Sequence, residues 1–505
     1  MRQDPFKTVK LVFTAASQKE LPLSWLKGLG YPVLTLRGLV SGELSRVMVK
    51  HPGLSMLFLI TGIGPECSKK AAEIIVQDFH PLAIVNLGTC GLNTQGIRPE
   101  TGTIVWPEFT VDNSGNEFPC HSHFLFPLPE DLDLQKVQEI QSLNAPLTKR
   151  DSSRAAFVDM EAAFQHRVFS RNGIRFGVFK VITDSCNGST PGDYAKNLAM
   201  VQSRLKDVLS FLESPLEGED VSVVIPVYNR ALSVKKAVDS VLAQSMPPGE
   251  IIVVDDGSTD ETVKVLRNYG DRIRMISSKK NRGVSAARNA GIKKATGKWI
   301  ALLDSDDIWL KDKLMHQVHY LETNPFWQIM QCDEIWIRNG QRVNKCRHHE
   351  KKEGWIWDIS LERCMISPSC VILRRDLAEN CGLFDPQMPA CEDYDLWLRV
   401  SRNHPVGFNP HPDVVKYGGH EDQLSRKFRA MDRFRVYSLI KSLEIESDAI
   451  HAERLRSSIL FRLSILEGGA RKRGMTQEER AYHSLAERVK KGHARCRDCH
   501  FLLKG

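Results

Sequence analysis

Short apolar runs alternate with segments of helical periodicity along the first 210 residues. The runs are rich in Val, Ile and Leu, and nearly continuous runs of this kind are typical of buried strands. Strands are predicted at 10–14, 54–61, 82–87, 103–105 and 175–182, with helices at 65–79 and 159–171. This alternation predicts an α/β domain. The pattern of residues 111–150 is irregular and predicts no element.

The same alternation starts again after residue 220 with clearer signals. Further strands are predicted at 221–227, 251–254 and 299–303. Between the first two strands, four apolar residues share one face of a predicted helix: Val234, Val238, Val241 and Leu242. Ser258, followed three residues later by Glu261, has the pattern of a capping box and predicts that the next helix begins there. We therefore expect a second α/β domain, with chemistry at the carboxyl ends of its strands.

The composition allows several domains. The chain has 505 residues, 42% of them hydrophobic and 26% charged, which is enough for more than one large core. A polar stretch with Pro and Gly separates the two halves. The predicted parts are an N-terminal domain, a linker, a second domain and a helical, basic C-terminal extension, at 1–213, 214–220, 221–429 and 430–505. The net charge is +8, and the last 75 residues hold 16 Lys and Arg against 10 Asp and Glu.

Several classes of protein are poor matches to this sequence. No apolar stretch approaches the ~18 residues of a membrane span, and the N-terminus lacks a secretory apolar segment. We expect a cytoplasmic protein whose twelve cysteines are reduced. The charge excess is mild and the basic extension has few aromatic residues, so nucleic acid is not an expected partner. A peripheral contact of the extension with anionic lipid head groups stays open, beside a plain solvated helical face.

Three acidic clusters are the strongest chemical signal. They lie at 255–256, 304–307 and 392–393, and the first two directly follow predicted strands. Crowded carboxylates repel each other unless a cation neutralises them, and Mg²⁺ or Mn²⁺ binds one or two carboxylates together with substrate phosphates. One such cluster alone would more often be a solvated turn. Three in this order favour a site that binds a nucleotide diphosphate through a divalent ion.

Five segments of the second domain resemble motifs of the family-two glycosyltransferases. They are VSVVIPVYN at 221–229, IVVDDGSTD at 252–260, NRGVSAARNAG at 281–291, DSDD at 304–307 and EDYDLWLR at 392–399. The resemblance covers about 221–425 and implies the glycosyltransferase A fold, a nucleotide-binding αβα sandwich. It also implies an inverting transfer of a sugar from a nucleotide-sugar donor to a glycan, lipid or small-molecule acceptor.

The same resemblance implies roles for individual residues. The donor would be bound by Pro226, Tyr228, Asn229, Asp256, Arg288, Asn289 and Asp304. Asp306 would be the main ligand of Mg²⁺ or Mn²⁺, with Asp304 beside it. Asp393 would be the general base that deprotonates the acceptor hydroxyl. His420, which follows two glycines, would contact the diphosphate or the metal, although a structural role for this loop histidine is equally open.

The first half carries a second set of candidate residues. Glycine-containing loops at 62–64 and 88–91 follow predicted strands, where backbone amides can face an anion or a sugar. Glu161 and Asp184 are acidic, and Asp184 ends a predicted strand. One carboxylate can accept hydrogen bonds from both hydroxyls of a ribose, and an acid near a purine nitrogen helps the base to leave. The alternative is a helix-surface Glu and a turn Asp.

These residues lie in segments that resemble the nucleoside phosphorylase superfamily, closest to the methylthioadenosine/S-adenosylhomocysteine nucleosidase and futalosine hydrolase group. The segments are LITGIGP at 59–65, IVNLGTCGL at 84–92, VDMEAA at 158–163 and KVITD at 180–184. Over about 8–212 the resemblance implies a phosphorylase-like three-layer sandwich. It implies Gly88, Met160 and Glu161 at the nucleoside, Asp184 as the acid on the base, and Glu20 as the residue that activates water.

The resemblance has two departures. Gly91 is followed by Leu92 where the group usually has a second glycine, and the segment before Asp159 is short and polar. The identity of the base and the choice between hydrolysis and phosphorolysis therefore stay open. We expect a purine nucleoside as the ligand, and we keep open a homodimer through the N-terminal domain.

The sequence as a whole predicts a bifunctional fusion of a nucleosidase-like domain and a metal-dependent glycosyltransferase. Two alternatives remain. The N-terminal domain could bind a nucleoside without cleaving it and act as a sensor, or the whole chain could be a scaffold with decayed sites. The intact Asp304, Asp306 and Asp393 argue against the scaffold.

Overall fold

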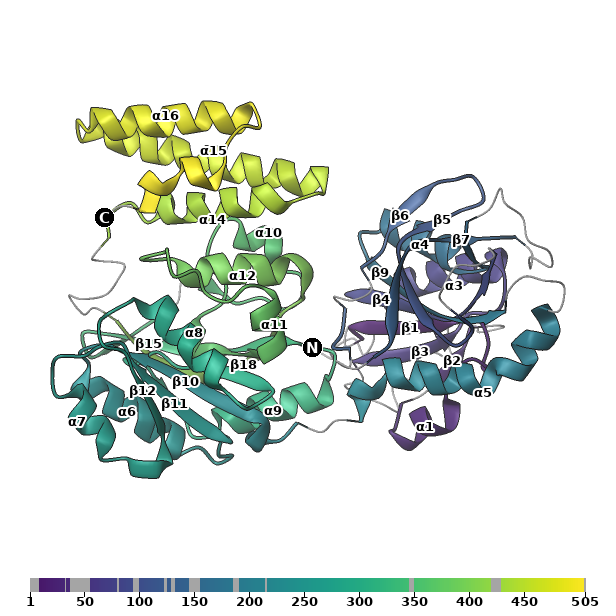
Figure 1. The fold of residues 1–505 in the computed structure, drawn as a ribbon, viewed down its shortest axis with the longest axis horizontal. Coiled ribbons are helices and arrows are strands. Elements are labelled where there is room, and N and C mark those ends of the chain that lie inside the picture. The colour runs from purple at the N-terminus through teal and green to yellow at the C-terminus, as the bar shows by residue number, and fades with distance from the viewer. Residues whose placement is uncertain are drawn as a thin grey trace. The chain divides into compact units, whose positions relative to one another are not determined.

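The structure is a computed structural model that describes most of the chain (Figure 1). The described residues are 9–31, 33–36, 55–79, 81–93, 100–121, 125–128, 132–144, 155–184, 190–213, 216–344, 349–418 and 428–503, with the backbone alone at 184 and 190–194. The chain divides into two compact units. Unit 1 comprises Met1–Pro215 with Thr323–Phe326, and unit 2 comprises Leu216–Glu322 with Trp327–Gly505.

Unit 1 is built on one mixed sheet. Its strands are β1 (Leu11–Ala15), β2 (Val33–Thr35), β3 (Met56–Ile60), β4 (Ala83–Leu92), β5 (Ile104–Val111), β6 (Glu117–Pro119), β7 (Leu134–Ser142), β8 (Phe157–Asp159) and β9 (Arg175–Asp184). The strand order is β2-β3-β1-β4-β8-β7-β5-β6, and β9 pairs with both β4 and β5. The pairings of β4, β8, β7, β5 and β9 therefore close into a ring. β6 and β7 lie in the region whose sequence pattern predicts no element.

Helices complete the α/β arrangement of unit 1. They are α1 (Leu23–Gly28), α3 (Pro65–Asp78), α4 (Ala162–Arg171) and α5 (Thr190–Val208). Buried side chains of α3 and α4, such as Ile75 and Phe169, join those of β1, β3, β4 and β9 in one apolar core. All five residues of β1 and of β3 are buried, as continuous apolar runs predict for inner parallel strands.

Unit 2 is built on a second mixed sheet of order β12-β11-β10-β13-β17-β15-β18-β14, with β16 beside β15. The strands are β10 (Val221–Val227), β11 (Glu250–Asp255), β12 (Arg274–Ser277), β13 (Trp299–Leu302), β14 (Ile308–Trp309), β15 (Ile329–Arg338), β16 (Gln341–Val343), β17 (Val371–Arg374) and β18 (Gly407–Gly418). β12, β11, β10 and β13 are parallel neighbours. Since the chain leaves β10 toward β11 and later returns to its other side at β13, the strand order reverses between β10 and β13.

The helices of the second sheet are α6 (Ala231–Leu242), α7 (Thr262–Arg267), α8 (Val284–Lys294), α9 (Lys313–Thr323), α10 (Trp357–Ser360), α11 (Arg375–Asn380) and α12 (Glu392–Asn403). Of the four residues predicted to share a face of α6, the three valines are buried and Leu242 is half-buried. The predicted capping box is wrong, because α7 begins at Thr262 with Glu261 as its N-cap. The Ser258 hydroxyl instead accepts a hydrogen bond from the Asn229 N–H at 2.9 Å.

Three long helices follow the sheet, and Figure 1 shows them stacked in the yellow-green part of the chain: α14 (Asp432–Ile445), α15 (Ala449–Lys472) and α16 (Thr476–Lys490). The predicted helical extension is thus confirmed. These helices share one apolar core with α10 and α12, to which Trp357, Tyr394 and Leu398 contribute. Among the described helices, none combines the length and the apolar character that crossing a bilayer requires.

Candidate functional site

The reversal of strand order between β10 and β13 creates the candidate site of unit 2. The two strands pair only as far as Val224 and Leu302, and the last β10–β13 contact is the Leu303 N–H bond to the Val224 carbonyl at 3.1 Å. Beyond it the strands separate, which is where open α/β sheets bind ligands. Pro226 lies at this point of β10. Proline has no backbone N–H, but β10 no longer pairs with β13 here, so no carbonyl of β13 is left without a donor.

Two adjoining pockets open there. The large pocket has a volume of about 900 Å³ and is lined by Tyr228, Asn229 and Asp256, among others. The acidic pocket has a volume of about 440 Å³ and contains Asp304, Asp306 and Asp393. Both pockets are lined by Pro226, Arg230, Val284 and Ser305. The structure therefore brings the predicted donor residues, with the exception of Asn289, and the predicted base to one continuous crevice.

The walls of the large pocket are held by side-chain bonds to backbone amides. Asn229, in the left-handed region at φ 50°, accepts the Thr259 N–H at 2.8 Å. Asp256 accepts the N–H groups of Arg282 and Gly283 at 2.9 and 2.7 Å. Burial nevertheless raises the pKa of Asp256, against the two amides. Gly257, at φ 78°, lies so close to the Lys280 backbone that a Cβ would be 2.7 Å from its carbonyl carbon, so only glycine fits this turn.

The three strand-end aspartates of the acidic pocket have different surroundings. Asp307 is buried, and it accepts the Ser369 hydroxyl at 2.6 Å and the Tyr417 N–H at 3.2 Å. Burial raises the pKa of Asp307 to about 8, against the charge of Lys416. Burial first, and then the charge of Asp304, raise the pKa of Asp306. Burial alone would also raise the pKa of Asp304, but a guanidinium, together with the charge of Lys416 and a hydrogen bond with Ser369, holds that pKa low.

That guanidinium belongs to Arg288 of α8. Arg288 is buried and donates to Asp304 at 2.6 Å and to Glu392 at 2.7 Å, so it joins the strand-end aspartates to the start of α12. Its neighbour Asn289 exchanges two hydrogen bonds with the backbone of Phe384. Of these two predicted donor residues, Arg288 lines the acidic pocket, whereas Asn289 is absent from the lining of both pockets and holds the segment after α11.

Asp393 lies in the first turn of α12, where the helix dipole favours a carboxylate. The residue before the helix, Cys391, is in the left-handed region at φ 59°, an unusual conformation for a side chain of this size. One Asp393 oxygen accepts the Tyr394 N–H at 2.7 Å, and the other lies 3.6 Å from the thiol of Cys364. Asp393 therefore lines the acidic pocket from α12, with both oxygens in polar contact.

A divalent cation fits the aspartates of the acidic pocket. The carboxylate of Asp306 supplies hard oxygen ligands, and burial together with the charge of Asp304 raises its pKa. Its ion pair with Arg230 is long, at 3.8 Å. In the part of the chain that the structure describes, no group of three His, Cys, Asp or Glu is placed to hold a metal ion. His420, the third predicted metal residue, lies outside the described residues.

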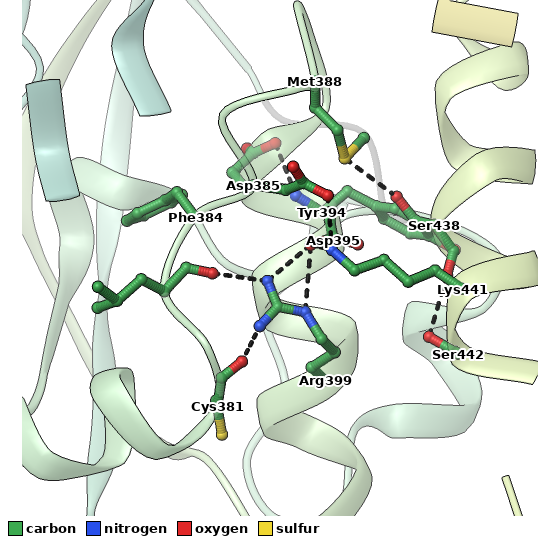
Figure 2. A network of polar contacts seen from close by, with 12 residues as sticks. Cys381, Phe384, Asp385, Met388, Tyr394, Asp395, Arg399, Ser438, Lys441 and Ser442 are labelled. Atoms are coloured by element: carbon green, nitrogen blue, oxygen red, sulfur yellow. Dashed lines mark hydrogen bonds and ion pairs between the residues drawn. The ribbon is translucent and has the colours of Figure 1, made fainter. Parts of the chain in front are cut away.

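Figure 2 shows the polar network that fixes α12. Lys441 of α14 donates to Asp385 at 2.7 Å and to the buried Asp395 of α12 at 3.1 Å. Arg399 also binds Asp395 and donates to the carbonyls of Cys381 and Leu383. The network thus ties the helix that carries Asp393 to α14 and to the segment that follows α11, of which Pro386–Pro389 line the large pocket.

Sequence reasoning did not find several residues of these pockets: Arg230, Cys364, Glu392, Lys416, Met431 and Arg435. The sequence showed Glu392 as part of the acidic cluster at 392–393, but it did not predict the ion pair of Glu392 with Arg288. The others come from segments without a motif, and only the fold brings them to the crevice. Met431 and Arg435 come from the start of the predicted helical extension, to which no site residue was assigned.

Unit 1 gathers the other predicted cluster. Glu20 is buried, accepts the Thr89 hydroxyl at 3.0 Å, and lies against Gly88, where a Cβ would be 3.2 Å from its carboxylate. Glu161 is also buried and accepts the Gly64 N–H at 3.2 Å. Both predicted glycine loops therefore contact predicted carboxylates. Met160 directly precedes Glu161 and is half-buried, and the side chain of Asp184, at the end of β9, lies outside the described residues.

A buried lysine holds these carboxylates together. Lys180 of β9 pairs with Asp159 at 3.0 Å, and its charge also acts on Glu20 and Glu161. Burial raises the pKa of Glu20, and it raises the pKa of Glu161 to about 7, in both cases against the charge of Lys180. Neither Lys180 nor Asp159 was predicted as a site residue, although both lie in the quoted segments.

Comparisons with known proteins identify the second unit. The family model "Glycosyl transferase family 2" matches residues 222–381. An uncharacterized glycosyltransferase of Rickettsia prowazekii is 34% identical over 210 residues, which cover 41% of this chain and 65% of that protein. The chain thus spans slightly less than two thirds of this relative's length. For unit 1, a methylthioadenosine/S-adenosylhomocysteine nucleosidase structure from Helicobacter pylori is similar at 14% identity and a TM-score of 0.30, covering 40% of this chain and 98% of that chain.

Other relatives are matched along more of their length. The Escherichia coli protein named UDP-Glc:alpha-D-GlcNAc-diphosphoundecaprenol beta-1,3-glucosyltransferase WfaP is 30% identical over 231 residues, which cover 45% of this chain and 88% of that protein. Together with the family match, and with the five motifs gathered around one crevice, this relative shows that the chain belongs to glycosyl transferase family 2.

Proposed function

We propose that unit 2 transfers a sugar from a nucleotide-sugar donor to an acceptor hydroxyl, with inversion at the sugar carbon. The observation that carries this proposal is the acidic pocket, in which Asp304 and Asp306 share one cavity with Asp393. The large pocket adjoins it and supplies room for a nucleoside, with Tyr228, Asn229 and Asp256 in its lining. Donor and acceptor would therefore meet at the border of the two pockets.

The proposed reaction is a single in-line displacement. Asp393 accepts the proton of the acceptor hydroxyl, the acceptor oxygen forms a bond to the anomeric carbon, and the bond from that carbon to the diphosphate oxygen breaks. The diphosphate leaves with the electron pair. The half-buried Asp393 suits this task because backbone and thiol contacts hold both its oxygens at the pocket surface.

Mg²⁺ or Mn²⁺ would be held by Asp306, with Asp304 beside it. When bound, such an ion stabilises the negative charge that develops on a departing diphosphate. Arg288 would keep Asp304 ionised and in place, because it donates to that carboxylate and is itself anchored to Glu392.

The relative's name guides the choice of substrates. WfaP is named for a UDP-glucose donor and for an acceptor sugar linked to diphosphoundecaprenol. We propose that this chain also takes a UDP-sugar and that its acceptor is a sugar hydroxyl.

The test is a donor screen with the full-length protein. UDP-sugars and GDP-sugars are incubated with Mn²⁺, and release of the nucleoside diphosphate is measured with and without a panel of sugar acceptors. We expect one nucleotide class to be consumed, and consumption to stop in excess chelator. If no nucleotide sugar were consumed or bound, the proposal would fail.

A second function is proposed for unit 1: cleavage of the N-glycosidic bond of a purine nucleoside. Its support is the buried cluster of Glu20, Glu161 and Lys180 beside two glycine loops. Glu161 would accept hydrogen bonds from the ribose hydroxyls, Glu20 would activate water, and Asp184 would protonate the base. Lys180 would hold the two glutamates at a fixed separation.

The test for unit 1 measures base release by the full-length protein. Adenosine, inosine and methylthioadenosine are offered with and without inorganic phosphate. Release without phosphate supports a hydrolase, and release only with phosphate supports a phosphorylase. Binding without release of any base would favour a nucleoside sensor over an enzyme.

A further inference from the structure

Helix α14 contributes a cation to the acidic pocket on the side of the proposed base. Met431 and Arg435, at the start of this helix, line the pocket together with Asp393 and Cys391. The Arg435 guanidinium lies 5.9 Å from the centre of the Tyr394 ring, and its charge acts on the thiols of Cys364 and Cys391, which flank Asp393. Arg435 therefore stands beside the place where the acceptor hydroxyl has to approach.

The other cations of this pocket face the strand-end carboxylates. Arg288 is bonded to Asp304 and Glu392, and the charge of Lys416 acts first on Asp307. Arg230 pairs with Asp306. Each of these three cations thus interacts with a strand-end aspartate, on the side of the pocket where the donor diphosphate is proposed to bind.

Arg435 has a different charge balance. It binds Asp432 at 3.1 Å, but the buried Arg462 lies 3.7 Å from the same carboxylate oxygen. Two guanidinium groups therefore share one carboxylate. About a third of the Arg435 side chain stays exposed, and its Nε has no hydrogen-bond partner. The unpartnered Nε is itself buried, so what the pocket receives at the acceptor side is the exposed, positively charged part of the Arg435 side chain.

The position of Arg435 relative to the base is fixed by the fold. One helical turn or two further along α14, Ser438 contacts Met388 and Lys441 binds Asp395 of α12, as Figure 2 shows. The helix that carries Arg435 and the helix that carries Asp393 are thus tied together by buried and half-buried contacts. A group held by Arg435 would have a defined distance from the base.

We propose that Arg435 binds a phosphate group of the acceptor and so places the acceptor hydroxyl at Asp393. A guanidinium matches a phosphate through two parallel N–H···O bonds, which gives orientation as well as affinity. The substrate class is accordingly a sugar that carries a phosphate or diphosphate, rather than a neutral glycan. This inference rests on the proposed transfer reaction and adds the chemistry of its acceptor.

The experiment compares paired acceptors in the full-length protein. Several hexoses and N-acetylhexosamines are each offered as the methyl glycoside and as the 1-phosphate, with a saturating UDP-sugar and Mn²⁺. The wild type should use the phosphate member of at least one pair with a kcat/KM about 10- to 100-fold higher, the scale of hydrogen bonds to a charged group. Arg435→Gln should remove this preference through acceptor KM, and Arg435→Lys should restore part of it.

Two further measurements separate the possible causes. The affinity for UDP with Mn²⁺ should be the same in Arg435→Gln as in the wild type, because the proposed ligand is the acceptor phosphate. A fall in UDP affinity would instead assign Arg435 to the donor diphosphate and overturn the proposal. Arg456→Gln is the matched control, since Arg456 pairs with Glu453 on α15 and does not line the pocket.

The outcomes distinguish this inference from the reaction it rests on. If the wild type consumes no nucleotide sugar, the proposed function itself fails. If it consumes one but shows no preference for the phosphate member of any pair, or if the preference survives in Arg435→Gln, the reaction stands and the role of Arg435 is refuted.

Discussion

Asp304 and Asp306 are two residues apart, yet their charges are compensated differently. Asp304 has a direct bond from Arg288 at 2.6 Å, and that contact lowers its pKa. Asp306 has only the longer contact with Arg230, and burial together with the charge of Asp304 raises its pKa. An added cation therefore stabilises Asp306 more than Asp304, as expected if Asp306 is the main metal ligand.

This difference predicts the effect of Asp306→Asn. The substitution removes a strand-end charge that Arg288 does not neutralise, so Mn²⁺ should no longer increase the affinity for UDP, and transfer should fall by ~10² or more. Calorimetric titration of UDP with and without Mn²⁺ measures the first effect directly. Unchanged activity in excess chelator would disprove the metal assignment.

The raised pKa of Glu161 predicts a pH dependence for unit 1. Only the ionised carboxylate accepts hydrogen bonds from both ribose hydroxyls, and burial raises its pKa to about 7. Nucleoside affinity should therefore be full above about pH 8 and weaken as the pH falls through 7. Titrations at pH 6 and pH 8 check this, and Glu161→Gln should bind weakly with no difference between them. An affinity independent of pH in the wild type would contradict the assigned role.

How far single residues were predictable depends on where they lie in the chain. Asp304, Asp306 and Asp393 were proposed because each lies in a short acidic motif, which for the first two directly follows an apolar run. Cys364 and Arg435 carry no local signal, since nothing in their own segments says that the fold brings them to Asp393.

At the scale of elements, periodicity was informative wherever one face of the element is buried. The helix α6 was predicted from three valines and Leu242, and the valines are buried there together with Ala237. The start of α7 was misplaced because Ser258 is used by Asn229 across the site and not by its own helix. β7 was not predicted because exposed polar residues interrupt its apolar positions, and its pairing with β5 and β8 is a tertiary property.

The contact between α14 and α12 yields an element-scale prediction. Lys441→Met leaves Asp385 and the buried Asp395 without one of their cations, and should destabilise unit 2 by about 1–3 kcal/mol. The donor KM should rise as well, because the segment after Asp385 lines the large pocket. Thermal unfolding and donor kinetics measure both effects. Lys490→Met, which removes an exposed pair on α16, is the control and should change stability little.

The same contact has a defined pH dependence. Burial alone would raise the pKa of Asp385, but the hydrogen bond and charge of Lys441, together with the Gln387 N–H and the charge of Arg399, lower that pKa below the ordinary 3.8. A lowered carboxyl pKa stabilises the folded state above the unfolded value and loses this contribution as the pH falls. The stability difference between wild type and Lys441→Met should therefore shrink when the pH is taken well below 4. A difference that stays constant would argue against an ionic contact.

At the scale of the whole molecule, the sequence predicted two α/β units and a helical end, and this class is what the structure has. It did not predict that the C-terminal helices share a core with α10 and α12 and supply residues to the acidic pocket. Amphipathic patterns show which face of a helix is buried, but not what covers it. The division of the chain between residues 215 and 216 lies within the stretch predicted as a linker.

The central claim is that Asp393 is the base of a sugar transfer in the acidic pocket of unit 2. The most direct measurement compares the full-length wild type with Asp393→Asn for UDP affinity and for the rate of transfer from a UDP-sugar. Our account predicts the same UDP affinity in both proteins, because the donor residues come from other elements, and a transfer rate at least ~10² lower in the variant. An unchanged rate, or a loss of UDP binding in the variant, would contradict it.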